Sequence, residues 1–282
     1  MKTKSLISTS IYLAQYFFPL VLSASLLLSC SKDSPSPDPD EELPTESGEM
    51  VDFYEVHRVE NWYVKVNYDN SSEGLKEAYY SLEYNKERDR SYQKTDLWDI
   101  SFSNMLNSFL GANNKSDESS FGFEGNGNGG ILILEEAFEE VTDIPDDSDF
   151  LTGRDGIGID GKSDFFVDRD VIGWYIYDWD GIILGDGSPD KAHTTYALGN
   201  PLELSDGSDA PIRTLVVRTA QGNYAKVKII SCYKDAETQE EMVKDAPKMY
   251  YTFEYMLVPA GIPRTPRGAA RNGPTLPSQA CR

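Results

Sequence analysis

The chain has 282 residues, of which 47 are Asp or Glu and 26 are Lys or Arg, so its formal net charge is −21. An acidic surface repels phosphate backbones, which excludes DNA and RNA as partners. Aromatic residues make up 12% of the chain, whereas acidic disordered chains contain few of them, so the composition indicates a folded protein.

The amino-terminal segment has the pattern of a lipoprotein signal peptide. Lys2 and Lys4 precede an apolar run over residues 12–28, and this run ends in Leu27-Leu28-Ser29-Cys30. A positive region followed by an apolar region is typical of secretory signals. The final four residues resemble a bacterial lipobox, whose cysteine thiol takes a diacylglycerol. We therefore expect Cys30 to be lipidated and to begin the mature chain; a simple secretory signal with a chance cysteine is the alternative.

Residues 30–49 predict a tether. Proline alternates with Ser and Asp between Ser34 and Asp40, and a polar, Pro-rich tract stays extended because it cannot form a core. Ser31-Lys32-Asp33 also resembles the surface-export signal of Bacteroidetes lipoproteins. The expected organisation is a signal peptide over 1–29, a disordered acidic tether over 30–49, one folded domain over 50–260, and a disordered, basic, Pro-rich tail over 261–282.

From about residue 50 the sequence alternates with the period of two that is typical of half-buried strands. Two of the expected strands flank a short loop that contains Gly222, which is a strong hairpin signal. In the second of these strands we expect Lys226 and Lys228 to face solvent, and Val227 and Ile229 to face the core. The expected strands cover residues 53–58, 61–68, 97–102, 171–177, 214–219, 224–230 and 249–258.

Helical periodicity is scarce, and only residues 135–141 and 236–246 could form short helices. Gly- and Asp-rich loops separate many of the expected strands. Short strands joined by polar turns predict an all-β fold, namely a single β-sandwich-type domain with short helices or none.

Catalytic motifs are missing from the sequence. His57 and His193 are the only histidines, and no His-Glu-x-x-His, Cys-x-x-Cys, P-loop or Gly-x-Ser-x-Gly pattern occurs. The acidic runs 143–149 and 164–170 lack the spacing of an EF-hand. Cys232 lies in an apolar strand, where a buried and unreactive thiol is expected. The sequence therefore predicts a binding protein rather than an enzyme, with a carboxylate-based hydrolase as the weakest option.

A dense aromatic group is formed by Trp174, Tyr175, Tyr177 and Trp179. Most of this group is expected to belong to the core, with Tyr175 and Tyr177 on one face of a strand and Trp174 on the other. His193 follows a Gly- and Asp-rich loop, so an exposed loop histidine is its simplest interpretation.

Several distinctive segments follow one another between residues 50 and 258: Trp98-Asp99-Ile100-Ser101-Phe102, Gly127-Asn128-Gly129-Gly130, Gly173-Trp174, Thr195-Tyr196-Ala197-Leu198, Arg218–Ile229 and Tyr250–Tyr255. Their order and approximate spacing resemble the HmuY family of Bacteroidetes haem-binding lipoproteins. The hairpin block Arg218–Ile229 is the most specific of these segments. The lipobox and the acidic tether fit the same family.

The resemblance implies an all-β domain that grips one haem and is anchored by lipid at the outer membrane, exposed on the cell surface. It also implies delivery of the haem to a TonB-dependent outer-membrane receptor. In the founding members of the family two histidines ligate the iron, and some relatives use Met instead. One family histidine follows shortly after the Gly-Trp pair; here the position five residues after Trp174 is Trp179, which cannot ligate iron.

The haem hypothesis therefore names His193 as the iron ligand, with Met105 as the alternative. An apolar slot would cover the macrocycle, and its expected members are Trp174, Tyr175, Phe165 and Phe166. The runner-up function is a surface glycan-binding lipoprotein without haem. Such a protein would stack sugars on Trp179 or Tyr177.

Replacing Cys30 by Ala removes the thiol that the lipobox offers for acylation. We expect this variant to leave the membrane fraction, because Gln15 and Pro19 interrupt the apolar run and make it a poor permanent membrane span. Fractionation of cells that express each form measures the change, with Cys281→Ala as the matched control. A Cys30→Ala protein that stays in the membrane fraction contradicts lipidation.

Overall fold

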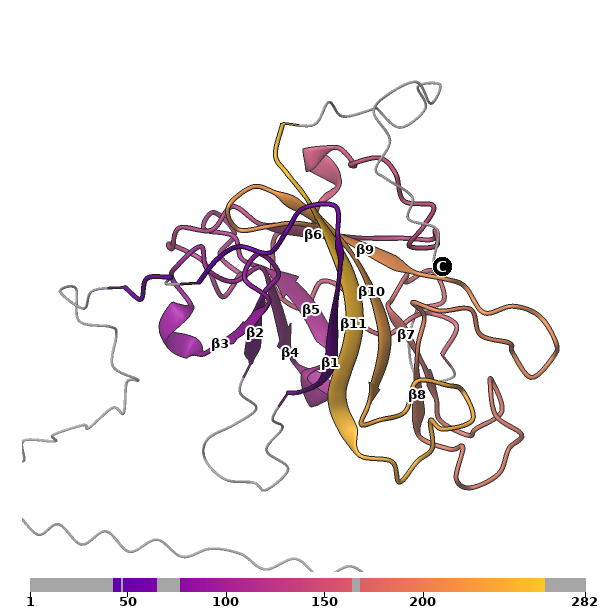
Figure 1. Ribbon diagram of the computed structural model, residues 1–282. Coiled ribbons are helices and arrows are strands. Elements are labelled where there is room, and N and C mark those ends of the chain that lie inside the picture. Colours follow the sequence, from indigo (N-terminus) through magenta and orange to yellow (C-terminus); the bar gives the residue numbers. More distant parts are fainter. Residues whose placement is uncertain (1–42, 47, 65–76, 164–167, 262–282) are drawn as a thin grey trace, which may run out of the picture. The chain divides into compact units, whose positions relative to one another are not determined.

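The computed structural model (Figure 1) describes residues 43–46, 48–64, 77–163 and 168–261. The signal peptide, the expected lipidation residue Cys30, the tether up to residue 42 and the tail beyond residue 261 lie outside the described residues. Phe165 and Phe166 also lie outside them. No helix within the described ranges is long and apolar enough to cross a membrane.

The folded domain contains antiparallel sheets, as Figure 1 shows. The largest has five strands in the order β1-β11-β10-β9-β6, so the first strand of the domain pairs with the last. Its strands are β1 (Val56–Tyr63), β6 (Gly130–Leu134), β9 (Thr214–Arg218), β10 (Tyr224–Tyr233) and β11 (Lys248–Val258).

A second sheet has four strands in the order β3-β2-β4-β5, and β7 and β8 form a separate pair. The four strands are β2 (Ala78–Ser81), β3 (Lys86–Arg88), β4 (Ile100–Ser103) and β5 (Phe109–Ala112). The pair consists of β7 (Tyr175–Asp178) and β8 (Thr194–Ala197). Short 3-10 turns are η1 (Arg90–Tyr92), η2 (Met105–Asn107) and η3 (Asp147–Asp149).

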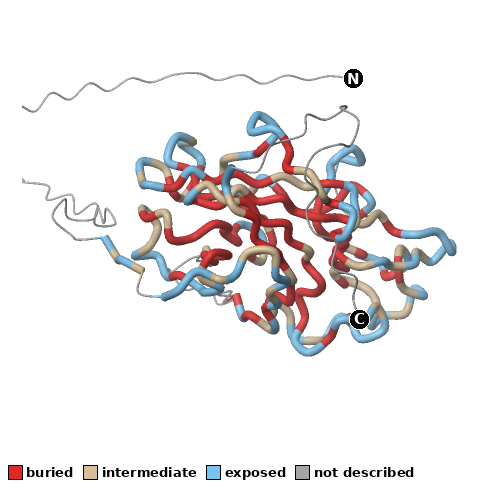
Figure 2. The backbone as a smooth tube through the Cα atoms, turned by 45° about the horizontal axis from the view of Figure 1, so that its top comes forward, coloured by how far each residue is buried: buried red, intermediate tan, exposed pale blue. Residues whose placement is uncertain are grey.

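Aromatic side chains pack the two larger sheets against each other. Trp62 of β1 meets Phe102 of β4 edge-to-face at 5.2 Å between ring centroids. Phe102 in turn lies 4.5 Å from Tyr251 of β11, and Tyr80 of β2 lies 5.4 Å from Phe253. Such pairs stabilise a core beyond the apolar area that they bury. Buried residues follow the strands and exposed residues gather in the loops (Figure 2). The all-β prediction is confirmed.

The two expected short helices are wrong. Residues 135–141 and 236–246 form only isolated turns. In the first segment the Nζ of Lys226 donates to the carbonyls of Phe138 and Val141. In the second, the Nζ of Lys191 donates to three carbonyls, those of Gln239, Glu240 and Met242. Lysine side chains thus satisfy backbone carbonyls in both non-helical segments.

The contact of Lys226 with the segment around Phe138 shows that one expected solvent-facing residue of β10 is buried. Lys226 is only 4% exposed, because Phe138 lies over its ammonium group, with Nζ 4.5 Å from the ring centroid. Burial lowers the pKa of Lys226. Lys228 remains half-buried and pairs with Glu254 at 3.1 Å. Val227 and Ile229 face the core as expected. Alternation therefore identified the two faces of the strand but did not reveal the loop that covers one of them.

The strand expected over residues 171–177 begins only at Tyr175. The preceding residues bond to another segment instead: Gly173 N donates to the Asp160 carboxylate and Trp174 N donates to the Gly158 carbonyl. The segment that contains Gly158 and Asp160 is held by Arg213, whose guanidinium lies 2.9 Å from the Asp160 carboxylate in a buried ion pair.

A buried carboxylate joins three parts of the chain at the start of β4. Asp99 is 1% exposed and accepts hydrogen bonds from the backbone N–H groups of Leu82, Glu83 and Ala220. The first two belong to the turn between β2 and β3, and Ala220 belongs to the hairpin turn between β9 and β10. The Trp-Asp segment and the hairpin block of the sequence therefore meet in space.

Glu83 is buried beside Asp99 and binds the same hairpin. Its carboxylate accepts hydrogen bonds from the hydroxyl of Thr219 and from the side-chain amide of Asn223. No basic side chain bonds to either carboxylate among the described residues. Burial, followed by the nearby Glu83 charge, raises the pKa of Asp99 to about 7, and burial also raises the pKa of Glu83.

This pair predicts a pH dependence of stability. A carboxyl group whose pKa is raised by folding stabilises the fold while it is protonated, so the contribution is full below the ordinary pKa of about 4. It is lost as the pH rises through the raised pKa near 7. We expect the unfolding free energy of the wild-type protein to fall between pH 5 and pH 8. In Glu83→Gln this fall should be smaller by about 1–3 kcal/mol. Urea unfolding at both pH values measures this, with exposed Glu87→Gln as the control; equal falls in all three proteins contradict it.

Candidate functional site

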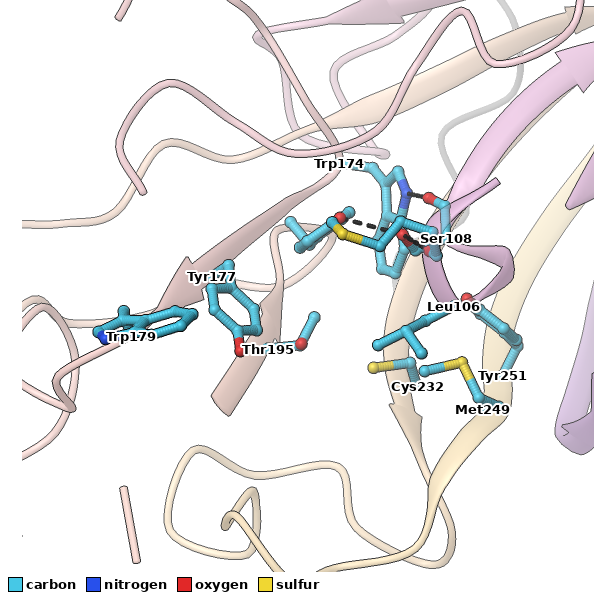
Figure 3. Close-up of a pocket in the computed structure, with 11 residues that line it drawn as sticks. Leu106, Ser108, Trp174, Tyr177, Trp179, Thr195, Cys232, Met249 and Tyr251 are labelled. Atoms are coloured by element: carbon cyan, nitrogen blue, oxygen red, sulfur yellow. Dashed lines mark hydrogen bonds between the residues drawn. The ribbon is translucent and has the colours of Figure 1, made fainter. Parts of the chain in front are cut away.

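A pocket of about 160 Å³ lies where the β7–β8 pair meets η2 and the ends of β10 and β11 (Figure 3). Its lining is mostly apolar. The hydroxyl groups in the lining belong to Ser108, Thr195 and three tyrosines. The residues that line it are Met105, Leu106, Ser108, Trp174, Tyr175, Tyr177, Trp179, Thr195, Cys232, Met249 and Tyr251.

One wall of the pocket is aromatic and comes from β7 and its flanks. Trp174 and Tyr175 are buried, and both are fixed to Ser108: the indole N–H donates to its carbonyl at 2.7 Å, and the phenol bonds to its hydroxyl at 3.0 Å. Trp174 lies on the same pocket as Tyr175 because β7 begins only at Tyr175, so strand alternation does not separate them. This wall is therefore rigid at its inner end.

The outer end of the aromatic wall is more open. Trp179 is 42% exposed and lies beside Tyr177, with 6.2 Å between ring centroids. Figure 3 shows Tyr177, Trp179 and Thr195 on one side of the pocket, and Cys232 and Met249 on the other. A flat apolar molecule that enters between these sides would contact aromatic faces first.

The opposite wall carries sulfur. Met105 is 43% exposed at the pocket, whereas Met249 and Cys232 are buried. Cys232 is a free thiol, as the sequence predicted, and burial raises its pKa to about 12. Such a thiol stays protonated at neutral pH and is a poor nucleophile.

Uncommon backbone conformations cluster around this pocket. Positive φ angles occur at Asn104, Leu106 and Asn107, which surround Met105, and at Met249. A residue with a side chain rarely adopts this region, and Leu106 and Met249 have no local polar group that would favour it. Strained backbone of this kind is concentrated at functional sites.

His193 lies next to the pocket without lining it. Its Nδ1 is 3.1 Å from the Tyr177 hydroxyl, and its ring meets Trp179 edge-to-face at 4.5 Å. Its backbone N–H donates to the carbonyl of Trp179. His193 is therefore half-buried and held against the rim of the pocket, rather than exposed in a loop.

His57 is far from this site. It lies opposite Tyr255 in the β1–β11 pairing, six residues from Met249 along β11. At about 3.3 Å of strand length per residue, six residues place His57 about 20 Å from Met249, which lines the pocket. The two histidines of the chain therefore do not form a pair, and the described residues contain no group of three or more His, Cys, Asp and Glu side chains that could hold a metal ion.

The structure thus brings together only part of the predicted site. Trp174, Tyr175 and Met105 line the pocket, and His193 contacts its rim. Sequence reasoning missed six pocket residues, namely Leu106, Ser108, Thr195, Cys232, Met249 and Tyr251. The missing signal is the pairing of β10 with β11, which brings Cys232 and the start of the last strand to one place.

The donor set of the pocket fits an iron porphyrin only at its mouth. The enclosed space of about 160 Å³ is smaller than the pockets of about 300–1,000 Å³ that surround drug-sized ligands. A porphyrin would not fit inside this space and could contact only its opening, where Met105 and Trp179 are exposed. Thioether and imidazole groups both serve as iron ligands in haem proteins, and Met105 and His193 would offer one of each.

No protein-family model and no curated protein matches this sequence. Among solved structures the chain is similar to the apo form of an HmuY analogue from Tannerella forsythia, with 14% identity over 73% of this chain and 95% of that chain and a TM-score of 0.32. It is also similar to a predicted lipoprotein from Bacteroides fragilis, with 13% identity over 71% of this chain and 89% of that one and a TM-score of 0.29. Superpositions with TM-scores this low support no statement about function.

The buried end of the aromatic wall is expected to be far more sensitive to substitution than its rim. Trp174→Phe removes the indole N–H that bonds to Ser108 and should lower the unfolding free energy by about 1–3 kcal/mol. The same change at exposed Trp179 should alter it by less than about 0.5 kcal/mol. Urea denaturation of the two variants compares them, and equal losses would show that Trp174 does not anchor the wall.

Proposed function

We propose that this protein is a lipid-anchored, surface-exposed outer-membrane protein that binds haem and passes it to a TonB-dependent receptor. The observation that carries the proposal is the pocket with a fixed aromatic wall on one side and thioether groups on the other, with His193 at its rim. The six sequence segments that resemble the HmuY family and the lipobox at Cys30 support it independently.

Haem, when bound, supplies an iron centre that takes axial ligands. Met105 and His193 are the side chains that would provide one, since both lie at the mouth. Tyr177 has an orienting role, because its hydroxyl bonds to Nδ1 of His193 and leaves Nε2 as the coordinating nitrogen. Trp179 supplies an aromatic face beside both residues.

The charges near the pocket suit a ligand whose acidic groups stay in water. None of the described lining residues is Lys, Arg, Asp or Glu. A porphyrin would therefore keep its carboxylates outside the pocket and bury only its apolar edge. Binding by one axial ligand and a shallow pocket is weaker than binding by a pair of histidines, which suits a protein that must release its cargo to a receptor.

A glycan-binding protein remains the second candidate, and one observation favours it. Trp179 is 42% exposed and borders a Gly- and Asp-rich loop, where a sugar ring could stack on its face. Tyr177 lies beside it. This function needs neither Met105 nor the inner pocket, and binding rather than catalysis is proposed in both cases.

Haem titration followed by the Soret band tests the proposal. We expect wild-type protein to shift the band, and Met105→Leu or His193→Ala to weaken binding according to which side chain is the ligand. If His193 is the ligand, the difference between wild type and His193→Ala should shrink from pH 8 to pH 5, because a protonated imidazole cannot coordinate.

Met256→Leu is the matched control, since this thioether is buried in β11 away from the pocket. Haem affinity that is unchanged in both Met105→Leu and His193→Ala excludes the two ligands. No Soret shift in any of the proteins moves the assignment to glycan binding, which calorimetry with wild type and Trp179→Ala then measures.

A further inference from the structure

The wall of the pocket opposite Tyr177 and Trp179 concentrates sulfur. The chain has 6 Met and 3 Cys in all, and three of these nine residues, namely Met105, Cys232 and Met249, line this one pocket. Thiolate and thioether are soft ligands, which select Cu(I) among the common biological metals. We propose that the base of the pocket is a binding site for a soft monovalent cation, Cu(I), held by the sulfur atoms of Cys232 and Met249.

Strand pairing brings two of these sulfur atoms together. Ser231 pairs with Thr252, and Tyr233 pairs with Lys248, so Cys232 stands opposite a bulge that contains Met249. Three residues of β11, of which Met249 is the first, therefore lie opposite the single residue Cys232. Figure 3 shows the side chains of Cys232 and Met249 next to each other, with Leu106 beside them.

The bulge aims Met249 into the pocket. Its φ angle is +67°, in the left-handed region that a residue with a side chain rarely adopts. Bulges re-aim single side chains and recur next to functional sites. Met105 comes from the η2 turn, whose neighbouring residues Asn104 and Leu106 also have positive φ angles. Both thioethers therefore reach the pocket through unusual backbone.

The thiol of Cys232 is available as a ligand. It is 3% exposed and forms no disulfide. On binding, a sulfur–metal bond forms and the thiol proton leaves to solvent, so neither the metal nor the sulfur changes its oxidation state.

Charge selects a monovalent ion over a divalent one. One thiolate and one monovalent cation make a neutral pair, so binding adds no net charge to the uncharged lining or beside the ammonium of Lys248, whose charge acts on Cys232. A divalent ion would leave one positive charge there. Zinc is also disfavoured because its structural sites use four Cys or His ligands, and only one such residue lines this pocket.

Titration with Ag(I), which is soft, monovalent and stable in air, tests the site. The full chain is used, with Cys30→Ser and Cys281→Ser in every sample, so that Cys232 is its one remaining thiol. We expect one equivalent to bind, with the release of one proton. The affinity should rise about tenfold per pH unit between pH 5 and pH 8, because the proton that leaves enters the equilibrium. Competition with a chromogenic Cu(I) chelator under anaerobic conditions repeats the measurement with Cu(I).

Three variants on this background decide the ligands. Cys232→Ser should abolish proton release, and Met249→Leu should weaken binding at least about tenfold while proton release persists. Met256→Leu, also buried in β11 but not in the pocket, should bind as the parent does. Thermal unfolding without metal confirms that each variant is folded.

The proposal is overturned if the parent binds no Ag(I), if Cys232→Ser binds as tightly as the parent, or if Met249→Leu and Met256→Leu have equal affinities. The haem proposal stands or falls separately. Haem binding is tested by Met105→Leu and His193→Ala in the Soret titration, and Ag(I) binding by Cys232→Ser and Met249→Leu, so the two sets of variants separate the two proposals.

Discussion

The carboxylate of Asp99 holds together three parts of this domain that are distant in sequence. It accepts backbone N–H groups from the β2–β3 turn and from the β9–β10 hairpin, and so ties the smaller sheet to the larger one at one point. Backbone donors at a buried turn must be satisfied, and a buried acceptor that serves three of them cannot be replaced by an apolar residue. The Trp98-Asp99 and Thr219–Asn223 segments are distinctive because each supplies one side of this joint.

The pocket adjoins the aromatic core between the two sheets that Asp99 ties together. Tyr251 packs against Phe102 in the core and against Trp174 at the pocket, and its hydroxyl bonds to the carbonyl of Asn107 in η2. The turn that carries Met105 is therefore held by a core tyrosine on one side and through Ser108 by Trp174 on the other. Positive φ angles can persist there because the surrounding contacts determine the backbone.

The sequence predicts those features of the fold that depend on local interactions. Alternation along β10 and β11 revealed both strands and the inward side chains Val227 and Ile229, because strand periodicity is a local property. The burial of Lys226 and the bulge at Met249 both depend on partners far along the chain. Trp174 and Tyr175 were identified by their aromatic density, whereas no feature near Cys232 or Met249 indicates that they share a pocket.

The pairing of β1 with β11 has a consequence for how the domain folds. Val56 lies beside Met256, so the largest sheet cannot be completed before the last strand is present. Pairings between residues so far apart in sequence give a high contact order, and chains of this kind fold slowly. β1 thus has no partner strand while the chain is still being made, whereas the four strands of the smaller sheet, which lie between residues 78 and 112, can already pair. The largest sheet therefore closes only after the smaller one has had time to form.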